Sequence, residues 1–370
     1  MGAGGGPVLV LNAGSSSLKY AVFDADLTER ARGMVEIGPG GAPDHPSALE
    51  RALARLEAAG LPLAAFTAAG HRVVHGGASL TEPARVTPEI IGKIRDLCAI
   101  APLHNPHNLA AIETLGALAP NLAQVAVFDT AFHAQMPEVA RRYALPARAA
   151  TADIRRYGFH GISYAALAEA LPEVSGAPPP RRLLALHLGA GASACAILDG
   201  RSVATTMGFS PLDGLDMASR SGSLDPEAVL VLAERLGTDG ARRLLWRESG
   251  LTGLAGSGDM RALMARGDPA ARFAVEHFAY WTIRHAGSLI AAMGGLDAVA
   301  FTGGIGEGAA PVRAAIMEGL GWAGLVPDRA ANAAGGPGLH APASPVAAWI
   351  VPAREERYIA ARTREIVATG

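Results

Sequence analysis

The sequence repeats one local pattern, and this repeat limits the possible folds more than any other feature does. Residues 8–37, VLVLNAGSSSLKYAVFDADLTERARGMVEI, share it with residues 183–209, LLALHLGAGASACAILDGRSVATTMGF. Each contains an apolar run, a turn of Gly and other small residues, a second apolar run, a turn with Asp, and a third run. Short apolar runs bounded by Gly, Asp and Ser predict strands. The repeat predicts two related domains, since a chain of 370 residues is too long for one hydrophobic core.

The remaining segments predict helices that alternate with strands. Amphipathic stretches at 48–59 and 225–247 predict helices, and apolar runs at 123–128 and 296–301 predict further strands. Alternating strands and helices are typical of α/β domains. The fold class expected from the residues is therefore α/β, with mixed sheets and crossover helices.

Composition excludes several classes of partner. The formal net charge is -2, which leaves no basic field for nucleic acid and no polybasic patch for a membrane surface. The first residues lack the basic region of a signal peptide, so nothing predicts secretion. Cys98 and Cys195 form no disulfide framework or metal pattern, and we expect two reduced thiols in a cytoplasmic protein. Small molecules are the expected partners.

The first glycine turn is not a Walker loop. No Gly-Lys-Ser follows it, and the chain continues into a strand where a Walker loop would begin a helix. Small residues in such a turn leave backbone N–H groups and hydroxyls open to an oxyanion. On its own, GSSSLK is more often an ordinary hairpin turn than a phosphate site.

Five further stretches combine reactive side chains with Gly or Pro. GHRVVHGG (70–77) predicts a two-valine strand flanked by Arg72 and His75, and APLHNPHNL (101–109) puts His104 in a turn. AVFDTAFH (126–133) ends a predicted strand at Asp129, a position where ligand-facing residues of α/β sheets tend to lie. The other two are RRYGFHG (155–161), with His160, and DMASRSGSLDP (216–226), with Arg220.

Three further stretches lie near the end of the chain, and the first two suit a nucleotide. SGDMR (257–261) offers Asp259, and FTGGIGEG (301–308) predicts a strand that runs into a glycine turn, where adenosine could lie against backbone. PAREERYIAARTREIV (352–367) predicts a terminal helix with adjacent Glu355 and Glu356. Taken alone, that pair would be the solvated face of a helix.

Together these motifs resemble the acetate kinase family (acetate/propionate kinases) of the sugar kinase, Hsp70 and actin superfamily. The blocks NAGSSSLK, GHRVVHGG, PLHNP, FDTAFH, YGFHG, MGFSPLDGL, SRSG and FTGGIGE occur in the family's order. The resemblance implies two ribonuclease-H-like (actin-like ATPase) domains with mixed sheets and a central cleft. It implies an N-terminal domain of residues 1–133 plus 357–370, and a nucleotide-binding domain of residues 134–356.

The implied reaction is reversible phosphoryl transfer from ATP to acetate, giving acetyl phosphate and ADP, with Mg²⁺ or alternatively Mn²⁺. The implied enzyme is a cytoplasmic homodimer that binds neither nucleic acid nor membranes. Domain closure over the cleft is expected, because water must be kept from the phosphoryl donor.

The resemblance also assigns roles to residues. Arg72 and Arg220 clamp the carboxylate and the transferring group, His160 donates to phosphoryl oxygens, and Asp129 orients an arginine or a metal-bound water. The substrate methyl group is assigned to Val74, Leu103, Phe159 and Pro211. The metal is assigned to Asn12 and Glu355, the latter in preference to Glu356. Phosphate or nucleotide binding is assigned to Ser15, Ser17, Lys19, His104, His187, Gly189, Gly191, Asp259, Met260, Arg261, Gly303, Gly304, Ile305 and Gly306.

Several positions depart from the family pattern, mostly where the nucleotide should bind. Ala190 and Gly308 replace asparagines, Tyr164 replaces a common histidine, and Arg354 stands beside the proposed metal ligand. These departures leave alternatives open. The chain could be a propionate or butyrate kinase, a relative that uses GTP or pyrophosphate as donor, or a non-catalytic nucleotide-binding protein.

Overall fold

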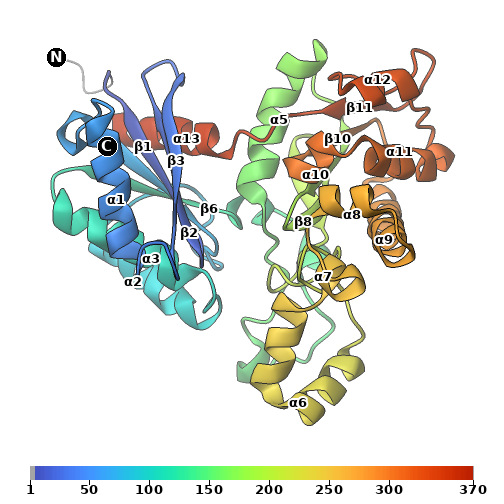
Figure 1. Cartoon of the computed structure of the whole chain (residues 1–370), viewed down its shortest axis with the longest axis horizontal. Coiled ribbons are helices and arrows are strands. Elements are labelled where there is room, and N and C mark those ends of the chain that lie inside the picture. The colour runs from blue at the N-terminus through green and yellow to red at the C-terminus, as the bar shows by residue number, and fades with distance from the viewer. Residues whose placement is uncertain (1–4, 370) are drawn as a thin grey trace. The chain divides into compact units, whose positions relative to one another are not determined.

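The chain forms two compact units in a computed structural model, which describes residues 5–369 (Figure 1). The first unit contains residues 1–134, 161–166 and 354–370, and the second contains residues 135–160 and 167–353. Residues 161–166 and 354–356 thus group with the first unit, and the predicted domain boundaries remain a proposal about which parts fold together. Among the described residues, no helix is both long and apolar enough to cross a membrane.

The first unit is a six-stranded mixed sheet with helices on both faces. The sheet order is β3-β2-β1-β4-β6-β5, in which β1, β4 and β6 are parallel and the other neighbours are antiparallel. Its strands are β1 (Val8–Ala13), β2 (Ser17–Phe23), β3 (Glu29–Glu36), β4 (Ala68–Val73), β5 (Ala84–Arg85) and β6 (Ala123–Phe128). Its helices are α1 (His45–Ala58), α2 (Pro88–Asp96), α3 (Asn105–Leu118) and α13 (Glu355–Thr369).

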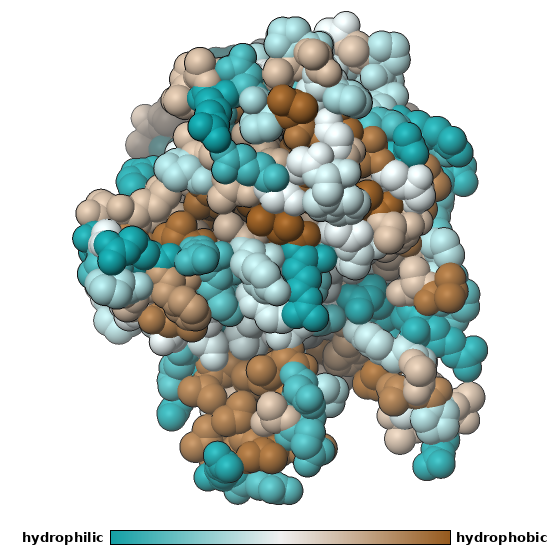
Figure 2. Space-filling view, turned by 90° about the vertical axis from the view of Figure 1, so that its right-hand side faces the viewer, coloured by the Kyte–Doolittle hydropathy of each residue, from teal (hydrophilic) through white to brown (hydrophobic). Residues whose placement is uncertain are grey.

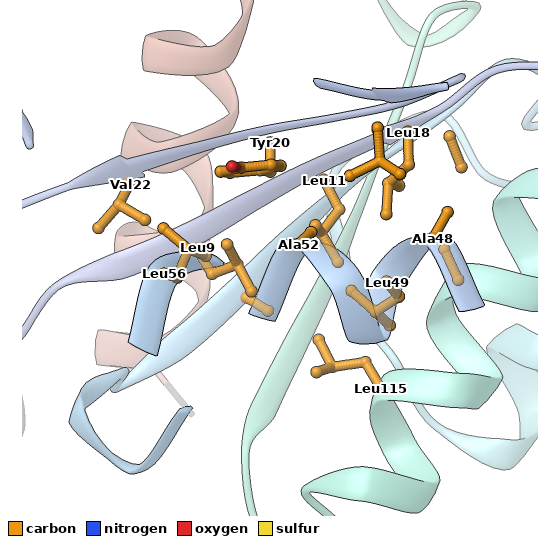
Figure 3. Packing of buried hydrophobic residues seen from close by; sticks show 14 of the residues in the cluster. Leu9, Leu11, Leu18, Tyr20, Val22, Ala48, Leu49, Ala52, Leu56 and Leu115 are labelled. Carbon is orange, nitrogen blue, oxygen red and sulfur yellow. The ribbon is translucent and has the colours of Figure 1, made fainter. Parts of the chain in front are cut away.

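Alternation along β1 builds a core on each face of this sheet. Leu9 and Leu11 pack with residues of α1 and α3, including Leu49 and Leu115 (Figure 3). Val8 and Val10 point the other way and pack with Ile359 of α13. In Figure 1 this red C-terminal helix lies beside the blue N-terminal strands. Helix α13 therefore covers the second face of the sheet.

The second unit repeats the sheet of the first. Its order, read as β9-β8-β7-β10-β11, matches β3-β2-β1-β4-β6, including the two antiparallel and two parallel pairings. Its strands are β7 (Arg182–Leu188), β8 (Ala192–Leu198), β9 (Arg201–Thr205), β10 (Ala298–Thr302) and β11 (Ala347–Ile350). The structure confirms the expectation of two related α/β parts that was based on the repeat.

The helices of the second unit lie mainly between β9 and β11 in the sequence. They are α4 (Glu138–Arg141), α6 (Pro226–Arg247), α7 (Gly250–Ala255), α8 (Met260–Arg266), α9 (Pro269–Met293), α10 (Gly303–Gly308), α11 (Ala310–Gly319) and α12 (Arg329–Ala334). Helix α5 (Gly161–Ser175) begins in the first unit and continues in the second. The long helix α9 starts at an Asp268 cap and ends at Gly294 in the left-handed region, which are ordinary start and stop signals.

Two local predictions were wrong. Strand β4 includes Arg72 and ends at Val73, so Arg72 and His75 do not flank a two-valine strand. The stretch after β10 is the short helix α10 and not a glycine turn. The reason is Glu307, whose Oε1 accepts the Gly303 N–H at 3.0 Å and so caps the first turn of this helix.

Candidate active site

The first unit brings Arg72 and Asp129 together at the ends of two neighbouring parallel strands. Val73 of β4 pairs with Phe128 of β6, so the residues on either side of that pair are close. Arg72 Nε donates to Asp129 Oδ1 at 3.2 Å and Oδ2 at 3.1 Å, and Nη2 also donates to Oδ2. Burial alone would lower the pKa of Arg72, but Asp129 beside it raises that pKa above its usual range.

The first glycine turn delivers its polar groups next to this ion pair. Asn12 and Lys19 are directly opposite each other in β1 and β2. Asn12 Oδ1 accepts from Arg72 Nη1 at 3.2 Å. Ser15 is exposed in the connecting loop, and Ser17 is the first residue of β2, with its carbonyl accepting the Gly14 N–H at 2.8 Å. The arginine, the amide and the lysine therefore share one end of the sheet.

Glu355 lies at the start of α13, where the charges of Arg72 and Lys19 act on its carboxylate. Burial raises the pKa of Glu355, Arg72 and Lys19 lower it, and Glu356 raises it. A hydrogen bond with Ser163 also favours the ionised form. Asn12 and Glu355 thus offer an amide oxygen and a carboxylate oxygen around Arg72, and Arg354 directly precedes the carboxylate.

Two buried asparagines fix the turn after β4, and the sequence reasoning missed both. Asn108 Oδ1 accepts the Val74 N–H at 3.0 Å while its Nδ2 donates to the Ala13 carbonyl at 2.7 Å. Asn105 makes paired bonds with the backbone of His75, at 3.1 and 3.0 Å. His104, which was singled out instead, occupies the N-cap position of α3. The signal was two asparagines three residues apart in NPHN, the spacing of one helix face.

The second unit gathers His160, His187 and Ser193 around the second glycine turn. His187 and Ser193 are opposite each other in β7 and β8, as Asn12 and Lys19 are in the first hairpin. The rings of His160 and His187 are 4.2 Å apart, and His160 Nδ1 lies 2.8 Å from Ser193 Oγ. His160 has a left-handed backbone (φ 56°) and precedes α5. Ser193, also missed from the sequence, orients the imidazole.

Arg220 reaches the same turn from the loop between β9 and α6. A Cβ built on Gly191 would lie 3.3 Å from His160 Nε2 and 3.7 Å from Arg220 Nη1, so both side chains approach this glycine closely. Arg220 Nη1 donates to the Pro211 carbonyl at 3.0 Å, and the guanidinium lies 5.3 Å from the centre of the Trp246 ring. The Ala218 N–H donates to the Ala190 carbonyl at 3.1 Å, which ties the Arg220 loop to the glycine turn.

A cavity of about 560 Å³ opens beside this turn in the second unit. Predicted nucleotide residues Asp259, Met260 and Arg261 line it at the start of α8, and Gly304 and Ile305 line it from α10. The Asp259 side chain caps α8 by accepting the Arg261 and Ala262 N–H groups at 2.9 and 3.2 Å. Gly189 also lines the cavity, whereas Gly303 and Gly306 are buried in α10.

The residues predicted to hold a methyl group divide between the units. Val74 and Leu103 belong to the first unit, where Val74 is buried and Leu103 half-buried. Phe159 and Pro211 belong to the second and are both buried. Within the second unit, Pro211 is linked to Arg220 through its carbonyl.

Comparison with known proteins identifies the family. A model described as the Acetokinase family matches residues 7–361. The chain belongs to this family. It is 46% identical over 385 residues to an acetate kinase of Rhodopseudomonas palustris strain TIE-1, covering 95% of this chain and 96% of that protein.

Solved structures of the family have the same fold. The acetate kinase of Porphyromonas gingivalis has a TM-score of 0.89 at 34% identity, covering 98% of this chain and 100% of that one. A propionate kinase from Francisella tularensis subsp. tularensis has a TM-score of 0.91 at 32% identity, with the same coverages. The α/β fold with two mixed sheets expected from the resemblance is confirmed, and so is membership of the family.

Two of the four departures from the family motifs, Ala190 and Gly308, lie in the second unit, and the other two, Tyr164 and Arg354, lie in the first. Ala190 and Gly308 both line the cavity, so two side-chain amides that the motif would supply are replaced by a methyl group and a hydrogen atom. Tyr164 is fully buried in the first unit and its ring packs edge-on against His133. The cluster of Asn12, Arg72 and Asp129 follows the motif.

Proposed function

We propose that this member of the acetokinase family is an acetate kinase, which transfers the γ-phosphoryl group of ATP reversibly to acetate. The observation that carries the proposal is the close approach of both His160 and Arg220 to Gly191, which puts two donors beside a glycine turn that could accommodate a phosphate. The family match over nearly the whole chain supports the same reaction.

The chemistry requires cations, because an anionic carboxylate must approach an anionic phosphate. An acetate oxygen forms a bond to the γ-phosphorus, the bond from that phosphorus to the β,γ-bridging oxygen breaks, and its electron pair leaves with ADP. No proton is consumed. Arg220 and His160 stabilise charge on the transferring group, and Arg72 binds the carboxylate of acetate. Asp129 keeps the Arg72 guanidinium oriented through its paired hydrogen bonds.

The residues around Arg72 fit a magnesium ion held jointly with the nucleotide. Asn12 and Glu355 supply hard oxygen donors, and an amide oxygen with one hydrogen bond retains a second lone pair. Residues 5–369 contain no cluster of three or more His, Cys, Asp or Glu side chains suited to a metal. Two protein ligands suffice when phosphates and water complete the shell. When bound, the ion neutralises charge on the phosphates.

Acetate is the proposed acceptor because the assigned apolar residues are bulky and mostly buried. Propionate is the second candidate, favoured by the likeness to a propionate kinase structure. One extra methylene changes discrimination by only about 1–3 kcal/mol, so propionate should be a poorer acceptor. GTP and pyrophosphate remain alternative donors, and a non-catalytic nucleotide-binding protein is the alternative of another class.

The test measures ADP release with Mg-ATP and acetate, propionate, butyrate or no acid. We expect acetate to give the highest kcat/KM, and Arg220→Ala to lower kcat by about 10³-fold or more. Arg242→Ala is the matched control, because Arg242 is an exposed arginine of the same unit paired only with Asp239 on one helix. Acid-dependent release that survives Arg220→Ala would contradict the assigned role. If no acid-dependent turnover occurs with ATP, GTP or pyrophosphate as donor, the proposal that the protein is an enzyme would be contradicted.

A cytoplasmic homodimer is part of the proposal. ATP and short carboxylates are metabolites of the cytoplasm. Figure 2 shows apolar residues at the surface of the second unit. Large exposed side chains of this unit include Tyr280 of α9 (59% exposed) and Trp322 (68%). Trp322 Cζ2 lies 3.8 Å from the position that a Cβ on Gly287 of α9 would take, so Trp322 lies against the helix that carries Tyr280. Light scattering after gel filtration tests the dimer, and a monomer at assay concentration would contradict it.

A further inference from the structure

The loop that carries Arg220 is anchored at one end by a buried carboxylate. Asp216 lies four residues before Arg220 and is 4% exposed. Its Oδ2 is 3.3 Å from His277 Nδ1 on α9, and within residues 5–369 its Oδ1 has no hydrogen-bond partner. Burial raises the pKa of Asp216, and His277 opposes that rise. The imidazole of His277 is therefore the side chain that holds the Asp216 carboxylate.

A second hydrogen bond determines which nitrogen of His277 carries the proton. The Trp281 indole Nε1–H donates to His277 Nε2 at 3.0 Å. An indole N–H can only donate, so Nε2 must be the unprotonated nitrogen and Nδ1 carries the hydrogen that points to Asp216. Trp281 donates to His277 and His277 donates to Asp216, so the two hydrogen bonds run in one direction, an arrangement that fixes an imidazole in both tautomer and orientation.

The anchored segment leads directly into the turn that presents Arg220. The neck of the loop is closed between Gly214 and Ser223, whose backbone and hydroxyl groups bond at 2.9 and 3.1 Å. Inside the neck, the Met217 N–H donates to the Arg220 carbonyl at 3.1 Å, and Arg220 Nη1 lies 3.5 Å from Met217 Sδ. Asp216 is adjacent to Met217, so a shift of its carboxylate moves the residue that contacts the Arg220 side chain.

Other residues of the same turn bond to α7 and α6, and Asp216 links the turn to α9. The Leu251 N–H donates to the Met217 carbonyl at 2.9 Å, and the Ser221 N–H donates to the Leu245 carbonyl at 3.0 Å. These bonds fix the loop to α7 and to the end of α6. The contact between Asp216 and His277 attaches the loop to a third helix, α9, which has 25 residues.

From this geometry we propose that His277, held by Trp281, is a positioning residue that fixes the Arg220 loop through the carboxylate of Asp216. The inference rests on the proposed kinase function, in which Arg220 stabilises the transferring phosphoryl group. The His277 ring contacts Asp216, Phe273 and Trp281, and none of these three residues is assigned to substrate or nucleotide. Its effect must therefore pass through the loop.

The test compares His277→Leu, which removes both hydrogen bonds, with His277→Asn, which keeps a donor near the Nδ1 position. His285→Leu is the matched control, because His285 lies on the other side of Trp281 at the same ring distance of 6.0 Å and its Nε2 has no partner among the described residues. Rates with acetate and ATP are combined with amide hydrogen exchange of the peptide spanning residues 214–223.

We expect His277→Leu to lower kcat about 10–100-fold with the KM for ATP unchanged, and to speed exchange of that peptide. His277→Asn should recover most of kcat, and His285→Leu should match the wild type in both measurements. Equal exchange and rates in His277→Leu and His285→Leu would overturn the proposal, as would an Asn variant no better than Leu. If the wild type has no activity, the proposed function fails, while the exchange comparison still decides whether His277 holds the loop.

Discussion

Replacing Asp129 by Asn should weaken the first unit and leave the second intact. The Asp129 side chain is 2% exposed and accepts three hydrogen bonds from Arg72, whose side chain is 21% exposed. An amide cannot accept from both Nε and Nη2 in the same way, and its NH₂ group would face a guanidinium. The substitution therefore breaks the pair while keeping the shape of the side chain.

The size of the stability loss depends on how much water and nearby negative charge stabilise the Arg72 guanidinium once Asp129 is replaced. Breaking a buried ion pair by removing one partner costs about 3–5 kcal/mol. Arg72 retains some contact with water and stays close to the negative charges of Glu355 and Glu356, so we expect a loss at or just below the lower end of that range. A loss of about 2–3 kcal/mol corresponds to roughly 30–150-fold faster exchange of amides that open with β4 and β6.

The assay can separate the units because all four tryptophans, Trp246, Trp281, Trp322 and Trp349, lie in the second one. Hydrogen exchange of peptides covering β4 and β6 reports on the first unit, and tryptophan fluorescence during urea unfolding reports on the second. Arg72→Met and the double variant complete a cycle whose coupling energy should be about 2 kcal/mol. The reasoning would be refuted if the substitution left hydrogen exchange in β4 unchanged. It would also be refuted if the urea midpoint of tryptophan fluorescence showed the second unit losing as much stability as β4 does.

Three further predictions follow from single contacts. Gly161→Ala should destabilise the protein by about 1–3 kcal/mol in urea unfolding, because its Cβ would lie 2.2 Å from the Asp129 carbonyl oxygen; a stable variant would contradict this close approach. Ala190→Asn should lower the KM for ATP by roughly two- to tenfold in initial-rate measurements, because it adds an amide in the cavity, and an unchanged KM would show that the nucleotide does not pass there. Burial lowers the pKa of His71 to about 4, so its contribution to stability is complete above about pH 6.5 and falls as the pH drops toward 4. His71→Gln should reduce the loss of urea stability between about pH 7 and pH 5 by about 2 kcal/mol, and an identical loss in both proteins would assign the acid sensitivity to other groups.

The repeat predicted the first three strands of each sheet because apolar runs and small-residue turns are local signals. Strand 123–128 and the helix starting after Asp225 were predicted on the same basis and are confirmed. The helix at Gly303 was not predicted, because its first turn depends on a side chain four residues away that caps an N–H otherwise left without a partner. Local propensity favours a turn in a run of glycines, and here the cap decides.

The candidate site was predictable where a reactive residue follows a strand, as Asp129 does, and not where its partner comes from elsewhere in the chain. Ser193 lies 33 positions from His160, and Asp216 lies 61 positions from His277. No spacing rule connects such residues, and only the sheet register and the packing of α9 bring them together. Asn105 and Asn108 are an intermediate case, since their spacing marks one helix face but their backbone partners lie outside that helix.

The packing of α13 on the first sheet affects the order in which the chain can acquire structure during synthesis. Gly70 of β4 approaches Thr363 and Ile359 so closely that a Cβ on it would lie 2.3 and 2.7 Å from their side chains, and this contact joins residues almost 300 positions apart. A ribosome finishes the second unit before it releases that helix. The N-terminal strands, although made first, must therefore wait with one apolar face uncovered until α13 has been made. A nascent chain stalled after residue 353 should bind general chaperones through residues 8–23, and release of the last turns of α13 should end that binding.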